Sequence, residues 1–216
     1  MSRSARALLL SSVLVAIGLV IALMLVQGPV AENSTAVAVD AGDVPVREFD
    51  AQLGEGDDVV LVVFSDFECE GCGIIAGSFE RLTDDFSGQV TIVHKHMPLS
   101  SHPRAMDAAA ASEAAALQGR FWEMHDLLFA EQDTWRAADD HRALFSEYAE
   151  QLGLDVQRFE RDMHSAEVAE RVEADRRDGE ELGVNLLPTV YINGSPVAGA
   201  MTYRMLHDAI DQVLNK

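Results

Sequence analysis

Cys69 and Cys72, the only cysteines of the chain, follow closely on a continuous apolar run at residues 59–64. This run is rich in β-branched residues and does not alternate with polar ones, which is typical of a strand buried on both faces of a sheet. A disulfide between cysteines this close would hold almost nothing together. The pair is therefore a redox pair, half of a metal site or an accidental pair, and the fold has to place it where a buried strand ends.

The residues that follow the pair favour redox chemistry. An amphipathic pattern over residues 74–86 predicts a helix, so the cysteines lie at a helix N-terminus. Unpaired backbone N–H groups and the positive end of the helix dipole stabilise a thiolate at Cys69 and lower its pKa. Cys72 is nearly one turn away on the same face, where it can close a disulfide or resolve a mixed one. We expect Cys69 to be the attacking sulfur and Cys72 the resolving sulfur.

The rest of the globular region alternates between sheet and helix signals. Strands are predicted at residues 59–64, 90–94, 189–192 and 195–198, with Asn193-Gly194 as a hairpin turn. Helices are predicted near residues 74–86, 105–117, 121–130, 140–152, 155–164, 166–182 and 203–214. Pro103 suits a first helical position, ahead of the alanine-rich stretch at 105–117.

Four segments make the chain resemble DsbA-like thioredoxin-fold oxidoreductases. They are the active-site peptide at 64–72, the stretch at 94–102, the stretch at 118–126 and the segment at 183–194. The resemblance covers residues 49–216 and implies an α/β fold, a thioredoxin-like sheet interrupted by a helical insertion at about 103–182. It also implies a cis peptide bond at Pro188 beside the disulfide, with the backbone of Leu187 pairing to substrate.

Two features depart from the family's pattern. Val63 stands where many relatives carry a buried acid that helps move the proton of the second cysteine, so Cys72 must use water or another group. The dipeptide between the cysteines is Glu70-Gly71, where strongly oxidising relatives carry proline and histidine.

Carboxylates surround the predicted nucleophile, at Asp66, Glu68 and Glu70. Like charges disfavour a second anion, so these acids are expected to oppose the helix dipole and raise the pKa of the Cys69 thiol. A less stabilised thiolate means a less oxidising disulfide. We therefore expect a disulfide donor or isomerase of moderate oxidising power. The alternatives are a reductase or maturation factor of the same fold, or a metal-handling or peptide-binding module.

The N-terminal region predicts export. Arg3 and Arg6 precede an uncharged apolar run at residues 7–26, long enough for a transmembrane helix, and the arginines place the N-terminus in the cytoplasm. We divide the chain into a cytoplasmic stub and anchor at 1–27, a flexible linker at 28–48 and the catalytic domain at 49–216. A cleaved signal peptide, which would leave a secreted or periplasmic domain, is the alternative.

The expected partners follow from charge and chemistry. A formal net charge of −20 argues against nucleic acids and anionic lipid surfaces. Exported thiol or disulfide proteins are the expected substrates, with a membrane redox partner to restore the pair. No dissociable cofactor is implied, because the disulfide itself carries the redox equivalent. No metal is expected either, because His94, His96 and His102 form no recognisable ligand spacing with the cysteines.

Overall fold

A computed structural model describes residues 43–198 and 201–216 of the chain. The predicted membrane anchor and most of the predicted linker lie outside these residues. Within the described ranges, no helix combines the length and the apolar character needed to span a bilayer.

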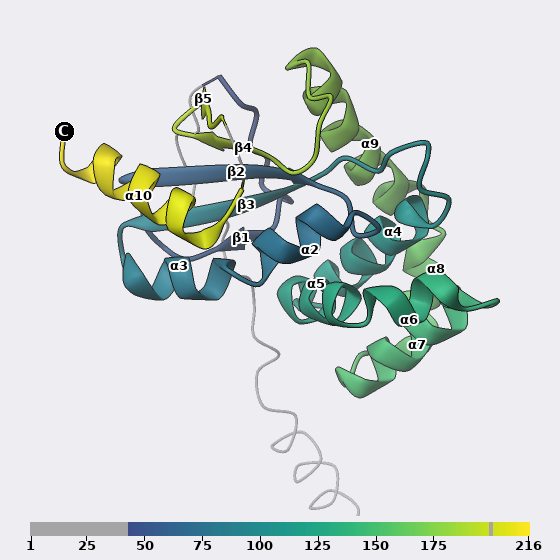
Figure 1. Cartoon of the computed structure of the whole chain (residues 1–216). Helices are drawn as coiled ribbons and strands as arrows, with labels where there is room; N and C mark the ends of the chain where they lie inside the picture. Colours follow the sequence, from purple (N-terminus) through teal and green to yellow (C-terminus); the bar gives the residue numbers. More distant parts are fainter. Residues whose placement is uncertain (1–42, 199–200) are drawn as a thin grey trace, which may run out of the picture. The chain divides into compact units, whose positions relative to one another are not determined.

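A five-stranded mixed sheet forms the centre of the domain, in the order β1-β3-β2-β4-β5 (Figure 1). Its strands are β1 Gln52–Leu53, β2 Val59–Ser65, β3 Val90–His96, β4 Thr189–Ile192 and β5 Ser195–Pro196. β2 and β3 pair in parallel, and the other pairings are antiparallel. Every residue of β2 and β3 is buried, because helices cover both faces of these two strands.

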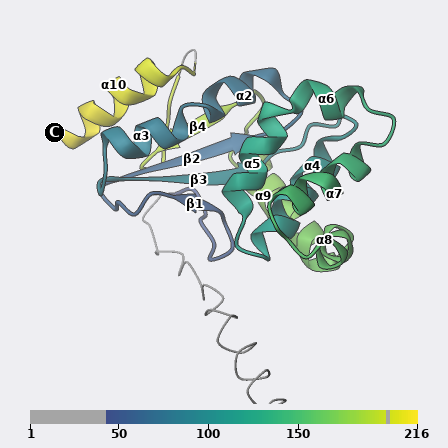
Figure 2. The same ribbon diagram turned by 90° about the horizontal axis from the view of Figure 1, so that it is seen from below.

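Helices pack on both faces of the sheet and beyond one end of it. They are α2 Glu70–Ala76, α3 Phe79–Asp85, α4 Ala105–Ala116, α5 Phe121–Ala130, α6 Gln132–Ala137, α7 His141–Gln151, α8 Val156–Met163, α9 Ala166–Glu181 and α10 Tyr203–Leu214. Figures 1 and 2 both show α4 to α8 gathered at the end of the sheet where β2 and β3 finish. The helical insertion therefore lies next to the loop that leaves β2.

The side chains of β2 alternate between two cores. Val59, Leu61 and Val63 pack with apolar side chains of α2, α3 and α10. Val60, Val62 and Phe64 belong to the core on the opposite face. There α9 approaches closely because Gly179 has no side chain, and a Cβ at that position would lie 2.7 Å from the sulfur of Met97.

The structure refines three local predictions. The helix predicted over 74–86 is two helices, because the chain breaks its helical run at Gly77 and Ser78. The prediction for Pro103 is wrong, because α4 begins at Ala105 after a turn that contains the proline. The short strand β1 and the helix α6 were not predicted, since neither is long enough to show a clear period.

A buried ionic network joins the start of the domain to the sheet. The Nζ atom of Lys95 on β3 lies 2.5 Å from Asp50, 2.8 Å from Asp175 and 3.2 Å from Asp178. Arg47 also binds Asp178. Burial raises the pKa of Asp175 to about 6.

Residues within the predicted linker also belong to the packed domain. Val44 is buried in the core shared with Phe64, and Arg47 reaches α9. The packing of the domain thus begins before residue 49.

We predict that Lys95→Met destabilises the domain by about 3–5 kcal/mol, because it leaves buried carboxylates without their cation. Urea unfolding measures the change. Arg204→Met is the matched control, since Arg204 and Asp208 are exposed and 4.0 Å apart, and its removal should change stability little. Similar losses in the two variants would contradict a stabilising role of the buried network.

Candidate active site

The two cysteines lie where β2 gives way to α2. Cys69 is the N-cap residue of α2 and is partly exposed, whereas Cys72 lies in the first turn and is fully buried. Both are thiols in this structure. The backbone N–H groups of Cys72 and Gly73 donate to the Cys69 carbonyl at 3.2 Å, which begins the helix.

The two thiols have opposite acidities. The pKa of Cys69 is lowered to about 6, chiefly because the Cys72 thiol donates a hydrogen bond to it. Backbone N–H groups of Cys72 and Gly71 lower it further, while burial and the charge of Asp66 raise it. The same hydrogen bond, together with burial, raises the pKa of Cys72. The accessible thiolate is therefore at Cys69, where the sequence predicts the attacking sulfur.

Hydrogen bonds hold the nearest carboxylate, Asp66, in place. It is buried and accepts backbone N–H bonds from Glu68 at 2.7 Å and Leu99 at 2.8 Å, and it lies 2.8 Å from Nδ1 of His102. A carboxylate with several donors can remain close to a thiolate without dominating its pKa.

The other two carboxylates are also engaged. Glu68 accepts the backbone N–H of Arg104 at 2.8 Å, and exposed Glu70 lies 3.4 Å from Arg136. The expectation that the acids oppose the helix N-terminus holds for Asp66, whose charge raises the pKa of Cys69. The Cys72 thiol and the backbone N–H donors outweigh this effect.

The loop before β4 faces the nucleophile. The Leu187–Pro188 peptide bond is cis, which confirms the predicted conformation. The Sγ atom of Cys69 lies 4.0 Å from the Leu187 carbonyl oxygen. Gly71 lies beside the same loop, since a Cβ there would be in ordinary contact with Cδ of Pro188 at 3.4 Å and Sγ of Cys69 at 3.8 Å. Of the residues predicted to shape the site, Gly71, Leu187 and Pro188 thus lie close to the Cys69 sulfur. Glu70 is directed towards Arg136 on α6.

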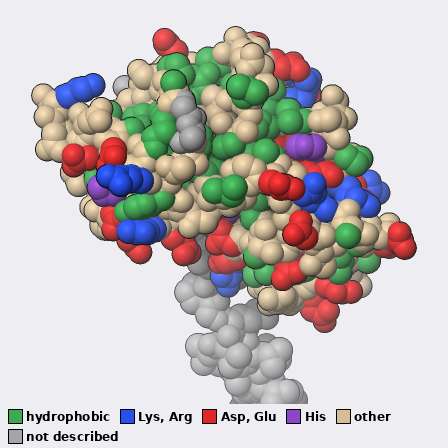
Figure 3. Space-filling view, in the orientation of Figure 1, with side chains coloured by type: hydrophobic (Ala, Val, Ile, Leu, Met, Phe, Trp, Pro, Cys, Tyr) green, Lys and Arg blue, Asp and Glu red, His purple; other side chains and the backbone are tan. Residues whose placement is uncertain are grey.

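Apolar side chains are exposed on the elements that carry the site. Ile74 on α2 is 70% exposed, and Leu186 beside the cis-proline is 76% exposed. Figure 3 shows hydrophobic side chains gathered over the region of α2 and β4, with acidic side chains mainly around them. Such a surface can contact an extended, partly unfolded polypeptide.

One residue of the helical insertion holds the active-site loop and was missed by the sequence analysis. Gln132 on α6 is buried and donates from Nε2 to the carbonyls of Phe67 at 2.6 Å and Cys69 at 3.1 Å. No sequence pattern could have indicated it, because the contact joins residues more than sixty positions apart through a helix that was not predicted.

On β2, an apolar residue occupies the position where many relatives carry a buried acid, and a histidine of β3 lies beside it. Val63 is in register with His94 of β3, and both are buried. Within the described residues neither ring nitrogen of His94 has a hydrogen-bond partner, and burial holds its pKa well below its usual value. Apart from Cys69, the polar groups that reach Cys72 are the backbone N–H of Asp66 and the Ser65 hydroxyl.

The remaining histidines near β3 have structural partners. His96 lies 3.0 Å from buried Glu113, and His102 contacts Asp66. Among the described residues, no three His, Cys, Asp or Glu side chains gather in a way that could hold a metal ion.

A sheet of this topology, a thiol pair at the end of its central strand and a facing cis-proline define a thioredoxin-fold redox protein. The sequence model of the family described as Thioredoxin matches residues 53–212. The chain belongs to this family, as a thioredoxin-like thiol–disulfide oxidoreductase whose Cys-x-x-Cys pair is Cys69 and Cys72.

Solved structures share the fold. A thioredoxin-like oxidoreductase from Silicibacter pomeroyi DSS-3 is 26% identical, with a TM-score of 0.67 over 79% of this chain and 95% of that one. The structure of alpha-DsbA1 from Wolbachia pipientis has a TM-score of 0.68 at 17% identity, over 80% of this chain and 94% of that one. These likenesses confirm the predicted α/β thioredoxin-like fold with its helical insertion.

Sequence relatives include much longer proteins. One from Mycolicibacterium gilvum (strain PYR-GCK), named Na(+)/H(+) antiporter NhaA 1, is 42% identical over 139 residues, which are 63% of this chain and 22% of that relative. The chain therefore spans about a fifth of the length of such curated relatives.

The pKa of Cys69 gives a pH prediction. Alkylation of the reduced protein by iodoacetamide should be slow below pH 6, where the thiol is protonated, and should reach a plateau above it, with a midpoint at about 6. Cys72→Ala should raise the midpoint towards the ordinary value of about 8.5, because it removes the main hydrogen-bond donor. A midpoint already near 8.5 in the unaltered protein would show that Cys69 is not activated.

Proposed function

We propose that the protein is an extracytoplasmic disulfide donor or isomerase of moderate oxidising power, acting on exported proteins. The observation that carries this proposal is the geometry of the pair: Cys69 is partly exposed at the N-cap of α2 and faces the Leu187 carbonyl, while Cys72 is buried in the first turn. The pKa of Cys69 is lowered to about 6, which is the direction that favours the reduced pair. The more a fold stabilises the thiolate, the more it favours the reduced pair and the more oxidising the disulfide becomes.

The reaction moves two electrons from the substrate to the pair. A substrate thiolate attacks Sγ of Cys69, the Cys69–Cys72 bond breaks, and Cys72 leaves as a thiolate that takes up a proton. The second substrate thiolate then attacks the substrate sulfur of the mixed disulfide. This step releases the substrate disulfide and the Cys69 thiolate, which the Cys72 thiol and the backbone N–H groups stabilise.

The groups around the pair have distinct roles in this scheme. The Leu187 carbonyl and Pro188 face Cys69 and would align the substrate backbone. The Ser65 hydroxyl reaches Cys72, where its hydrogen bond stabilises the thiolate that leaves in the first step.

The location and the partners rest on the N-terminal sequence pattern. A membrane anchor at residues 7–26 would keep the domain on the outer face of the membrane and raise its effective concentration near a membrane redox partner. For net disulfide formation that partner is a thiol oxidase that accepts two electrons and regenerates the Cys69–Cys72 disulfide.

The reduction potential tests the oxidising power directly. The full-length protein is equilibrated with glutathione buffers, and we expect a value between about −120 mV and about −270 mV. A value near the reducing end of this range would mean that the protein is a reductase and not a disulfide donor. A value at the oxidising end would contradict the moderate strength.

Trapping tests the action on proteins. We predict that Cys72→Ser accumulates mixed disulfides with exported proteins in cells, because the resolving thiol is gone while Cys69 still reacts. The adducts should disappear on reduction, and Cys69→Ser, the matched control, should form none. Equal adduct patterns in the two variants would exclude Cys69 as the reacting sulfur.

A further inference from the structure

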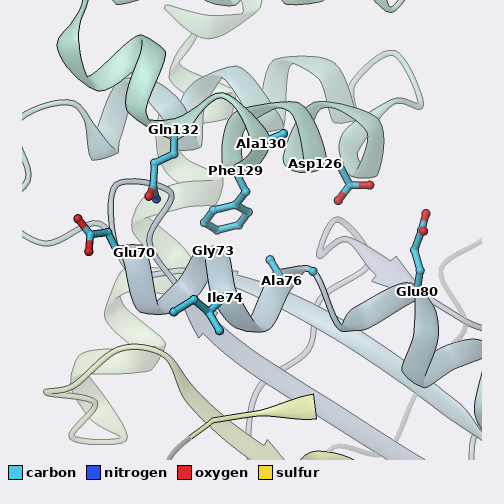
Figure 4. Close-up of a pocket in the computed structure, with 10 residues that line it drawn as sticks. Glu70, Gly73, Ile74, Ala76, Glu80, Asp126, Phe129, Ala130 and Gln132 are labelled. Carbon is cyan, nitrogen blue, oxygen red and sulfur yellow. The ribbon is translucent and has the colours of Figure 1, made fainter.

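A groove of about 440 Å³ lies between α2 and α5 and reaches Glu70, the residue that follows Cys69. Figure 4 shows the residues that line it. They are Glu70, Gly73, Ile74, Ala76, Gly77 and Glu80 on one side, and Asp126, Phe129, Ala130 and Gln132 on the other. Because Glu70 is next to Cys69 in the chain, a polypeptide held at the sulfur could continue into this groove.

Two glycines shape the wall of the groove that α2 provides. Gly73 lets α2 lie close to the ring of Phe129, since a Cβ there would be 3.3 Å from the ring. Gly77 faces open space, because the nearest atoms to a Cβ there are the Ile74 and Gly73 carbonyl oxygens at 3.9 and 4.0 Å. The floor is therefore apolar and hollow, with the exposed side chain of Ile74 along its edge.

The ends of the groove are acidic. Glu80 on α3 and Asp126 on α5 lie at one end, and Glu70 lies at the end near Cys69 (Figure 4). Within the described parts of the chain, no Lys or Arg lies within ion-pair distance of Glu80 or Asp126. The contact of Asp126 is with His125, whose pKa is lowered by burial, so that this partner is neutral.

Acidic residues on the outer helix α9 are arranged differently. Arg176 pairs with both Glu173 and Glu180, and Arg177 lies 2.6 Å from Glu170. The groove thus combines an apolar floor with two carboxylates, Glu80 and Asp126, that have no Lys or Arg partner among the described residues, whereas Glu70 at the other end lies near Arg136. A cationic side chain between Glu80 and Asp126 would complement this end of the groove.

We infer that this groove binds the substrate segment next to the reacting cysteine and selects segments that carry a lysine or arginine. The groove extends from Glu70 to Glu80, which are ten positions apart in a mainly helical stretch, a length of roughly 15 Å. An extended peptide covers that length in about four or five residues. The basic side chain is therefore four or five positions from the cysteine, between Glu80 and Asp126. This inference rests on the proposed function, because it names the substrate class of the same site.

Dithiol peptides test the selectivity. Two peptides differ only in carrying arginine or glutamine five residues from the reacting cysteine, and each is mixed with the full-length protein in its disulfide form. The second-order rate constant of mixed-disulfide formation is measured by rapid quenching. We expect the arginine peptide to react about tenfold faster, as two exposed ion pairs allow, and the advantage to shrink at high salt.

Variants locate the effect. In Glu80→Gln/Asp126→Asn, the ratio of the two rates should fall close to one. The control is Glu147→Gln/Glu150→Gln, which removes the same charge from exposed positions of α7 outside the groove and should keep the ratio. Gly77→Leu fills the hollow and should lower the ratio without altering any charge.

Each failure has a separate meaning. Equal rates for the two peptides, or a ratio that survives both groove variants, would overturn the inference while leaving disulfide donation intact. Absence of reaction with either peptide would instead overturn the proposed function. If the rate ratio were lost equally in the α7 control, net charge alone would be responsible. This result too would overturn the inference that the groove selects the substrate.

Discussion

The parallel pairing of β2 with β3 is the constraint on which the rest of this structure depends. Both strands are buried throughout, so their edges and faces must be covered by other parts of the chain. This requirement brings α2, α3 and α10 to one face and α9 to the other. It also fixes the point at which β2 ends, and the first residues after that point are those that carry the chemistry.

The electrostatics of the site follow from hydrogen bonding more than from the count of charges. Asp66 is near the thiolate, yet its oxygens already accept backbone N–H bonds and contact His102. The Cys69 sulfur receives its own donors from Cys72 and Gly71. A sequence of acids around a nucleophile therefore says little about its pKa until the partners of each acid are known.

The helical insertion both supports the active site and borders it. Gln132 holds the carbonyls of the loop that ends at Cys69, and Arg104 contacts Glu68 from the start of α4. The same insertion provides α5, which forms one wall of the acidic groove along α2. Catalysis and substrate choice are thus linked through one packed interface, because the elements that position the sulfur also shape the surface beside it.

Local sequence determined much of this protein. The apolar run of β2 and the spacing of the two cysteines were sufficient to predict the central strand and the redox pair, while the cis bond at Pro188 was implied by the family resemblance of its segment. Most helices were also predicted, because each carries its own period and ending signals. These features depend on residues that are neighbours in the chain, so the sequence displays them directly.

Other features were decided only by the tertiary structure. The net acidity of Cys69, the support from Gln132 and the groove between α2 and α5 each depend on residues far apart in the chain. Short elements such as α6 likewise owe their form to packing, since six residues show no reliable period. The sequence by itself therefore determined which chemistry the chain can perform. The tertiary contacts decided how acidic its nucleophile is and what surface lies beside it, because hydrogen bonds and burial arise only when distant segments meet.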